Sequence, residues 1–219
     1  MPQIDKSTLQ FLSDLKKHND RDWFNQNRKR YEAAKLNYET FVQEVINCIS
    51  TFDPIFRGLE VRSCTFRINR DIRFSADKSV YKTHMGAFIV RGGKKNGDKY
   101  TGYYVHVEPG NSFIAGGAHI PPAGWLKEIR EKIAERGDEL LKILNNKDFL
   151  NYFGAIEGEK LKTSPKGFPK DHPHVELLKF KSYIAEKSFT DEEITSEECL
   201  TGIVKGFRTM KPFNDFLTV

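Results

Sequence analysis

The stretch Tyr100–His119, YTGYYVHVEPGNSFIAGGAH, has the clearest strand pattern in the chain. Residues 100–108 alternate with the period of two that is typical of a β-strand. Pro109-Gly110-Asn111 supplies turn residues, and residues 112–119 read as a returning strand. The sequence therefore predicts an antiparallel hairpin, and this hairpin is the starting point for the fold.

The register of this hairpin assigns its two faces. If the strands pair across Glu108 and Asn111, Phe113 lies beside His106. The odd-numbered side chains of Tyr103–Val107 then form the core face, and the even-numbered side chains form a second, more polar face. On that face His106 and Glu108 are candidates for an acid and a base. A row that simply faces solvent or a covering helix is the more common arrangement.

Two more strands are predicted before the hairpin. The apolar pattern has a period of two over residues 62–74, where Cys64, Phe66 and Ile68 share one face. A second strand is expected over residues 86–91. The glycine-rich residues 92–99 join two strands instead of opening a helix, so a hairpin loop is a better interpretation than a phosphate-binding loop.

Helical periodicity flanks the strands on both sides. Before them, the pattern predicts a helix over residues 6–17 and a longer one, capped by Asn19 or Asp20, that continues to about Ser50 and ends before Asp53-Pro54. After them, helices are expected at 125–153, 175–180 and 196–210, with irregular chain at 154–175 and a short strand at 182–186.

These elements predict one α+β domain over residues 1–219. Its antiparallel β-meander sheet packs against N-terminal and C-terminal helices, because consecutive strands have short connections. The expected divisions are helical 5–52, mainly strands 62–120 and mainly helical 123–217. The chain shows no internal repeat and no linker-like change in composition.

Composition excludes several classes of protein. No apolar run approaches the ~20 residues that span a bilayer, and the N-terminus lacks the pattern of a secretory signal. Three widely spaced cysteines, Cys48, Cys64 and Cys199, indicate reduced thiols rather than a disulfide framework. We therefore expect a cytoplasmic protein with no membrane partner.

A dense group of charges lies in RINRDIRFSADKSVYK, residues 67–82. The two carboxylates of Asp71 and Asp77 stand among five cations: Arg67, Arg70, Arg73, Lys78 and Lys82. Such charges are costly beside a core unless each has a partner. The partner is either internal, namely the two aspartates, or external, namely an anionic ligand.

Arg70 is the distinctive residue of this group if residues 65–74 stay extended. One face then carries Arg67, Asn69, Asp71 and Arg73, and the other is apolar except for Arg70, since it holds Ile68, Ile72 and Phe74. Ser75 is expected to cap a turn that presents Lys78 and Lys82. Arginine forks and lysine charges on a rigid element suit recognition of phosphate or carboxylate.

The motif RxxRDxRFxxDKxxYKxHxG, from Arg67 to Gly86, resembles the signature of the DUF2461 family of bacterial proteins, which also occurs as a region in some fungal proteins. Three further segments are similar to typical segments of that family: NDRDWFNQNRKRY (19–31), YYVHVEPGNSFIAGG (103–117) and GEKLKTSPKGFPKDHP (158–173). The resemblance covers nearly the whole chain. Because the family has no established activity, the resemblance implies a candidate site without a reaction.

Three functions fit this pattern. The first is a binding module whose five cations hold a small anionic ligand; nucleic acid is a less favoured partner, because the net charge is only +5. The second is a metal-independent enzyme acting on a phosphorylated or otherwise anionic substrate. Its candidate catalytic residues are Asp71, Asp77, Tyr81 and His84. The third is a structural ion-pair lattice in a protein-interaction domain.

Neither a metal nor a cofactor is expected. Few carboxylates among many cations bind a divalent ion poorly, and the hairpin register separates His119 from His106 by roughly 20 Å. His172 and His174 lack a cysteine or carboxylate at a typical ligand spacing. The oligomeric state is left open.

Overall fold

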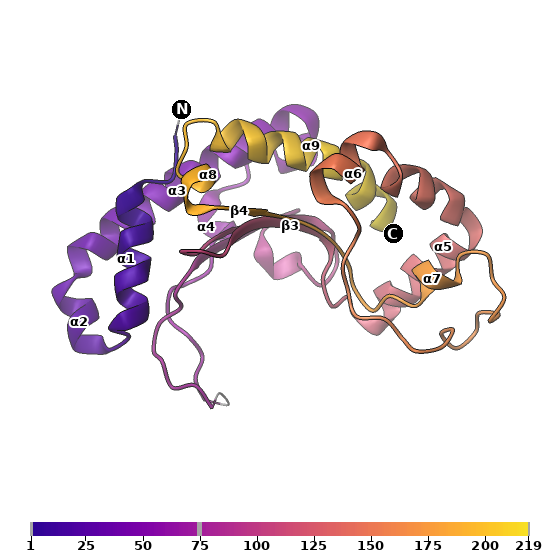
Figure 1. The fold of residues 1–219 in the computed structure, drawn as a ribbon, viewed down its shortest axis with the longest axis horizontal. Helices are drawn as coiled ribbons and strands as arrows, with labels where there is room; N and C mark the ends of the chain where they lie inside the picture. Colours follow the sequence, from indigo (N-terminus) through magenta and orange to yellow (C-terminus); the bar gives the residue numbers. More distant parts are fainter. Residues whose placement is uncertain (1, 74–75, 219) are drawn as a thin grey trace.

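A four-stranded antiparallel sheet lies at the centre of the computed structural model, which describes residues 2–73 and 76–218. The strand order follows the chain: β1 (Met85–Val90), β2 (Gly102–Val107), β3 (Ser112–Ala118) and β4 (Tyr183–Phe189). Figure 1 shows a curved sheet with α3 (Arg28–Phe52) and α9 (Cys199–Leu217) on its convex side. The predicted α+β class and antiparallel meander are confirmed.

The hairpin register is the predicted one. His106 lies opposite Phe113, and Val105 lies opposite Ile114. The odd-numbered side chains of β2 are buried, and Tyr103 packs on Phe207 of α9 with their ring centroids 4.9 Å apart. This face of the sheet is therefore the core face, and the even-numbered side chains point to the concave side.

The N-terminal helices differ from the prediction at one position. Helix α1 (Lys6–Lys17) has the predicted bounds, but the expected long helix is divided at Asn27 into α2 (Arg21–Gln26) and α3. The Asn27 side chain donates to the carbonyl of Trp23 at 2.9 Å, and this local bond competes with helix continuation. Asp20 caps α2 by accepting the N–H of Trp23. Helix α3 ends before Asp53-Pro54 as predicted, and a 3₁₀ turn, η1 (Pro54–Phe56), follows it.

The predicted helix over residues 125–153 is also two helices, α5 (Ala123–Leu144) and α6 (Lys147–Phe153). The break has a clear cause, because the Asn146 side chain accepts the N–H groups of Asp148 and Phe149 and so starts a new helix. The remaining elements are 3₁₀ turn η2 (Lys94–Asn96), α7 (Val175–Leu178) and α8 (Asp191–Ile194).

The predicted strand over residues 62–74 is wrong. Val61–Cys64 form a short helix, α4, and residues 65–73 belong to no strand of the sheet. Isolated bridges join Thr65 with Ala87 and Asn69 with Tyr81. Phe66, expected on the apolar face, is 43% exposed. The prediction depended on three apolar residues, and two of them, Cys64 and Ile68, are four positions apart. An apolar pattern this short therefore fits the spacing of a helix as well as that of a strand.

Residues 65–73 and 76–82 form the two sides of an arm that projects from the concave side of the sheet (Figure 1). Its two sides are joined by backbone hydrogen bonds from Arg70 N to Val80 O (2.9 Å) and from Lys82 N to Ile68 O (2.8 Å). The predicted places of Phe74 and Ser75 lie outside the described residues.

The base of the arm contains a bulge. Thr65 pairs with Ala87 and Asn69 pairs with Tyr81, so four residue steps on one side (69 − 65) face six on the other (87 − 81). The two extra residues lie within 82–86, and such an insertion redirects the side chains that it carries. His84 is in this bulge, and it leads directly into β1.

Two contacts anchor the arm to the N-terminal helices. The Asn19 side chain accepts the N–H of Tyr81 and donates to its carbonyl, both at 2.9 Å. The Tyr81 ring stacks on Phe24 of α2 with a centroid separation of 4.0 Å. The base of the arm is therefore held by a segment about sixty residues earlier in the chain.

The buried apolar side chains form a connected cluster that runs from Ile4 to Leu217. The three cysteines are free thiols; Cys64 and Cys199 are buried and Cys48 is half-buried. Within residues 2–73 and 76–218, no helix has the length and apolar character needed to cross a membrane.

Candidate functional site

The arginines and aspartates of the outer part of the arm, residues 70–73 and 76–79 (the tip), contact one another. Arg73 donates two hydrogen bonds to the carboxylate of Asp71, at 2.9 and 2.6 Å. Arg70 contacts Asp77 and the hydroxyl of Ser79. All of the tip's arginines and aspartates thus lie in local pairs, in a part of the chain that is largely exposed.

Asp77 is the most strongly perturbed carboxyl of the tip. The backbone N–H of Ser79 and the guanidinium of Arg70 lower the pKa of Asp77 to about 2. Lys78 takes a different partner, since its ammonium donates to the carbonyl of Ile72 at 3.3 Å. The tip therefore has a set of internal partners for the cations that the sequence places there.

Tyr81 belongs to the anchor of the arm. Its side chain is buried against Phe24. The structure does not bring Tyr81 into contact with the paired aspartates of the tip among the described residues.

The two cations at the base of the arm, Arg67 and Lys82, have different surroundings. Neither makes an ion pair with a carboxylate in the described parts of the chain. Lys82 is half-buried with its ammonium 5.3 Å from the centre of the Phe66 ring. Burial, and then the charge of Arg67, lower the pKa of Lys82.

A hollow of about 240 Å³ lies between α3 and the base of the arm, and we call it the arm hollow. Three cations line it, Lys35, Arg62 and Arg67, together with the single carboxylate of Glu39. Glu39 already faces Lys35 at 3.7 Å. Arg62 faces Glu60 at 3.3 Å, so Arg67 supplies the excess positive charge of this wall, to which His84 also belongs.

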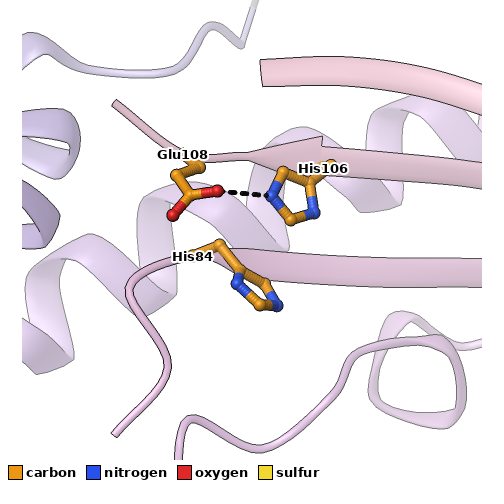
Figure 2. Close-up of side chains that lie close together, drawn as sticks. All are labelled: His84, His106 and Glu108. Atoms are coloured by element: carbon orange, nitrogen blue, oxygen red, sulfur yellow. Dashed lines mark hydrogen bonds and ion pairs between the residues drawn. The ribbon is translucent and has the colours of Figure 1, made fainter. Parts of the chain in front are cut away.

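His84, His106 and Glu108 form a compact cluster (Figure 2). His106 Nε2 lies 3.2 Å from Glu108 Oε2, and the ring of His84 is 4.4 Å from the ring of His106. One ligand atom of each residue lies within 4.8 Å of the other two. The β1–β2 register explains the meeting, because Gly86 pairs with His106 and so brings the residues before β1 to the end of β2.

Neighbouring side chains hold this cluster in place. The hydroxyl of Tyr104 lies 3.1 Å from His106 Nδ1, and the ring of Phe113 stacks on His106. The carboxylate of Glu108 accepts hydrogen bonds from Thr83 at 2.7 Å and from Asn111 at 3.1 Å. Gly86 is required nearby, since a Cβ at this position would overlap the hydroxyl of Tyr104.

Burial and hydrogen bonding set the charges in the cluster. Burial, followed by the proximity of His106, lowers the pKa of His84 to about 4. Burial also lowers the pKa of His106, although Glu108 opposes that shift. The pKa of Glu108 is lowered: burial acts to raise it, but hydrogen bonds from Thr83, Asn111 and His106 together outweigh burial. Near neutral pH the cluster therefore holds two neutral imidazoles and one carboxylate.

The sequence pattern identifies all three residues as candidates but does not group them. His106 and Glu108 were paired through the hairpin register, whereas His84 was assigned to the arm motif. Thr83, Tyr104 and Asn111 were not identified as supporting groups. The signal that was missed is the β1–β2 register, which places His84 at the same end of the sheet as Glu108.

A larger hollow of about 850 Å³ lies elsewhere, between α5, α6 and α9. Its charged lining is nearly balanced, with four cations and three carboxylates: Lys132, Arg136, Lys142, Arg208, Glu139, Asp148 and Asp215. None of the residues singled out by the sequence lines it. We therefore place the candidate site at the arm hollow and the histidine cluster, despite the larger volume of the other hollow.

The fold and the site together define an α+β protein in which a charged arm stands beside a His–His–Glu cluster. A family model described as "Conserved hypothetical protein (DUF2461)" matches residues 7–216. The chain therefore belongs to the DUF2461 family, as its motifs had indicated. Comparison with curated proteins and with solved structures gave no match.

Proposed function

We propose that the protein binds a small anionic ligand, a phosphate or a carboxylate, in the arm hollow. The observation that carries this proposal is the contrast between two arginines of one arm. Arg73 is occupied by Asp71, whereas Arg67 makes no ion pair with a described residue and lines a hollow with excess positive charge. An external anion would supply the missing partner.

The five cations of the motif thus divide into two groups. Arg70, Arg73 and Lys78 at the tip stiffen the arm through local contacts. At the base, Arg67 lines the hollow, whereas Lys82 lies outside its lining and would act through its charge near Arg67. The repulsion between these two cations would be relieved when an anion binds. The guanidinium of Arg67 suits this role, because its fork matches the oxygens of a phosphate or carboxylate.

The size of the hollow favours a small ligand. Its volume of about 240 Å³ is below the ~300–1,000 Å³ that is typical of pockets for drug-sized molecules. A phosphate or carboxylate group with a short substituent suits such a space better than a nucleic-acid strand does. Nucleic acid therefore remains the less favoured partner.

Calorimetric titration with inorganic phosphate and simple phosphate esters, at low salt and with a chelator present, tests this proposal. We expect Arg67→Ala to weaken binding at least tenfold, because a charged hydrogen-bond donor to the anion is lost. Arg73→Ala is the matched control and should bind as the wild type does. Absence of binding to every anion at low salt, or an equal loss in both variants, would contradict the proposal.

A second candidate function is chemistry on the bound anion. It is favoured by the row Tyr104, His106 and Glu108, in which each neighbour lies within 3.2 Å of the next and a neutral imidazole stands beside a carboxylate. Such a pair can move a proton. Turnover of a phosphate ester that is lost in His106→Asn, while phosphate binding persists, would support catalysis over simple binding.

A further inference from the structure

We propose that His84, His106 and Glu108 bind a divalent transition-metal ion, with zinc as the reference ion, through two imidazole nitrogens and one carboxylate oxygen. This site goes beyond anion binding and is independent of it. It also departs from the sequence-based expectation of no metal, which compared His106 with His119 and placed His84 with the arm motif instead of with His106.

The separations in the cluster are close to those of a metal site. Zinc binds imidazole nitrogen at about 2.0–2.1 Å and carboxylate oxygen at about 2.0–2.2 Å, so two ligands of one tetrahedral ion are roughly 3.3 Å apart. His106 Nε2 and Glu108 Oε2 are 3.2 Å apart. All three ligand atoms lie within 4.8 Å of one another, so His84 needs only a small shift to complete the set.

The position of His84 is the observation in the cluster that most favours a metal ion. The His106–Glu108 contact is satisfied as a simple hydrogen bond and requires no ion. His84 is half-buried against a second imidazole, yet its side chain forms no hydrogen bond with any residue that the structure describes. The ring nitrogens of His84 are therefore not occupied by any described protein group, and a neutral imidazole can offer one of them to a metal ion.

The supporting contacts resemble those around metal ligands in general. A ligating histidine usually uses its second ring nitrogen to contact an outer group, and ligating carboxylates are themselves hydrogen-bonded. Tyr104 lies at His106 Nδ1, leaving Nε2 toward Glu108. Thr83 and Asn111 hold the carboxylate. These contacts fix the orientation of two of the three proposed ligands.

The donor set selects the class of metal. Two nitrogens and one oxygen suit zinc, iron, cobalt or nickel, whereas calcium and magnesium prefer oxygen ligands. Three protein ligands leave at least one position open, as in catalytic zinc sites. His84 also lines the arm hollow, so an anion bound there would lie next to the open position.

Metal binding is measured on chelator-treated protein by competition with a chromophoric zinc chelator, and by visible absorption after addition of cobalt. We expect one equivalent of zinc per chain and a cobalt band typical of nitrogen and oxygen ligands. His84→Asn and Glu108→Gln should each weaken zinc binding at least tenfold and remove or shift the band. The exposed His119 supplies the control, and His119→Asn should leave both readouts unchanged.

Circular dichroism establishes that each variant is folded. Tyr104→Phe serves as a milder variant, because it removes only the hydroxyl and should weaken zinc binding by about tenfold. Zinc affinity and a cobalt spectrum that are the same in wild type, His84→Asn and Glu108→Gln would overturn the assignment. So would zinc binding that only His119→Asn reduces. Phosphate titration with chelator present reports on the arm hollow alone, so the two proposals fail separately.

Discussion

Asp77 shows how a single carboxyl sets the response of the arm to acid. The backbone N–H of Ser79 and the guanidinium of Arg70 lower its pKa to about 2, from an ordinary value of 3.8. Between these values the unfolded chain binds a proton and the folded chain does not. The stabilisation is therefore complete above about pH 4 and is lost as the pH falls toward 2.

We predict that the carboxyl carbon of Asp77, followed by NMR, titrates near pH 2 in the wild type. In Arg70→Ala its pKa should rise, because one of the two main contacts is lost. A midpoint near 3.8 in the wild type would show that the contacts with Ser79 and Arg70 do not form in solution.

At position 117 the backbone conformation and the close approach of a neighbouring strand require glycine. Its φ of +116° is disfavoured for other residues, and a Cβ would overlap the carbonyl of Tyr183 in β4. We predict that Gly117→Ala lowers the free energy of unfolding by about 2–4 kcal/mol, through backbone strain and loss of β3–β4 pairing.

Chemical denaturation measures this effect. Gly202 in α9 is the control, because no atom lies within 4 Å of a Cβ placed there. Gly202→Ala should stabilise the protein by about 0.5–1 kcal/mol, since alanine is the better helix former. An equal response of the two variants would argue against the strain at Gly117.

For single residues, the sequence predicted the orientation of side chains where a strand alternates between a buried face and a second face. The period of two predicted the faces of β2 and the pairing of His106 with Phe113. It failed at Phe66, which lies on the arm and is 43% exposed, whereas Ile68 of the same arm is buried.

At the scale of the elements, the arm is held by a residue that lies far from it in the sequence, Asn19. Asn19 binds both backbone groups of Tyr81, so Asn19→Ala leaves a partly buried N–H and a carbonyl without these partners. We predict a loss of about 1–2 kcal/mol of stability and faster amide exchange in the arm than in β2. Asn25→Ala, at an exposed position of α2, should change neither quantity. Unchanged arm exchange in Asn19→Ala would show that the stacking of Tyr81 on Phe24 suffices to hold the arm.

Helices and strands were predictable in kind, but several of their ends were not. Asn27 and Asn146 each interrupt a continuous helical pattern, because their side chains bond to nearby backbone groups. Apolar periodicity carries no information about such bonds. The arm was missed as an element for a related reason, since its form depends on isolated bridges and on contacts with α2.

The molecule as a whole is expected to unfold in one step. The buried apolar cluster extends from Ile4 to Leu217, and β4 pairs with β3 across about seventy residues of chain. Trp23 is in α2 and Trp125 is in α5, two helices that lie toward opposite ends of the molecule (Figure 1). The indole N–H of Trp125 donates to the carbonyl of Leu217. These two tryptophans therefore report on opposite ends of the molecule.

We predict that Trp23→Phe and Trp125→Phe, each with one remaining tryptophan, give melting curves in which tryptophan fluorescence and far-ultraviolet circular dichroism share one midpoint. This outcome is expected if residues 1–219 form the single domain proposed from the sequence. Two separate midpoints within one variant would divide the chain into independent units.

The long-range pairing of β4 is the feature of the fold least accessible from the sequence. A short strand was predicted near residue 183, but its partner was not, because local patterns do not specify which distant strand lies alongside. The approach of His84 to Glu108 was missed for the same reason, since it follows from pairing across the loop between β1 and β2.

The two outer strands of the sheet bear on how the protein avoids aggregation. The free edge of β1 is met by Thr65 at the base of the arm, and that of β4 is met by Glu157, which exchanges two backbone hydrogen bonds with Ile184. Open strand edges recruit strands from other molecules. Here each edge is partly covered by an irregular segment that forms a single bridge with it. We therefore expect the base of the arm also to hinder β-pairing between molecules at the edge of β1.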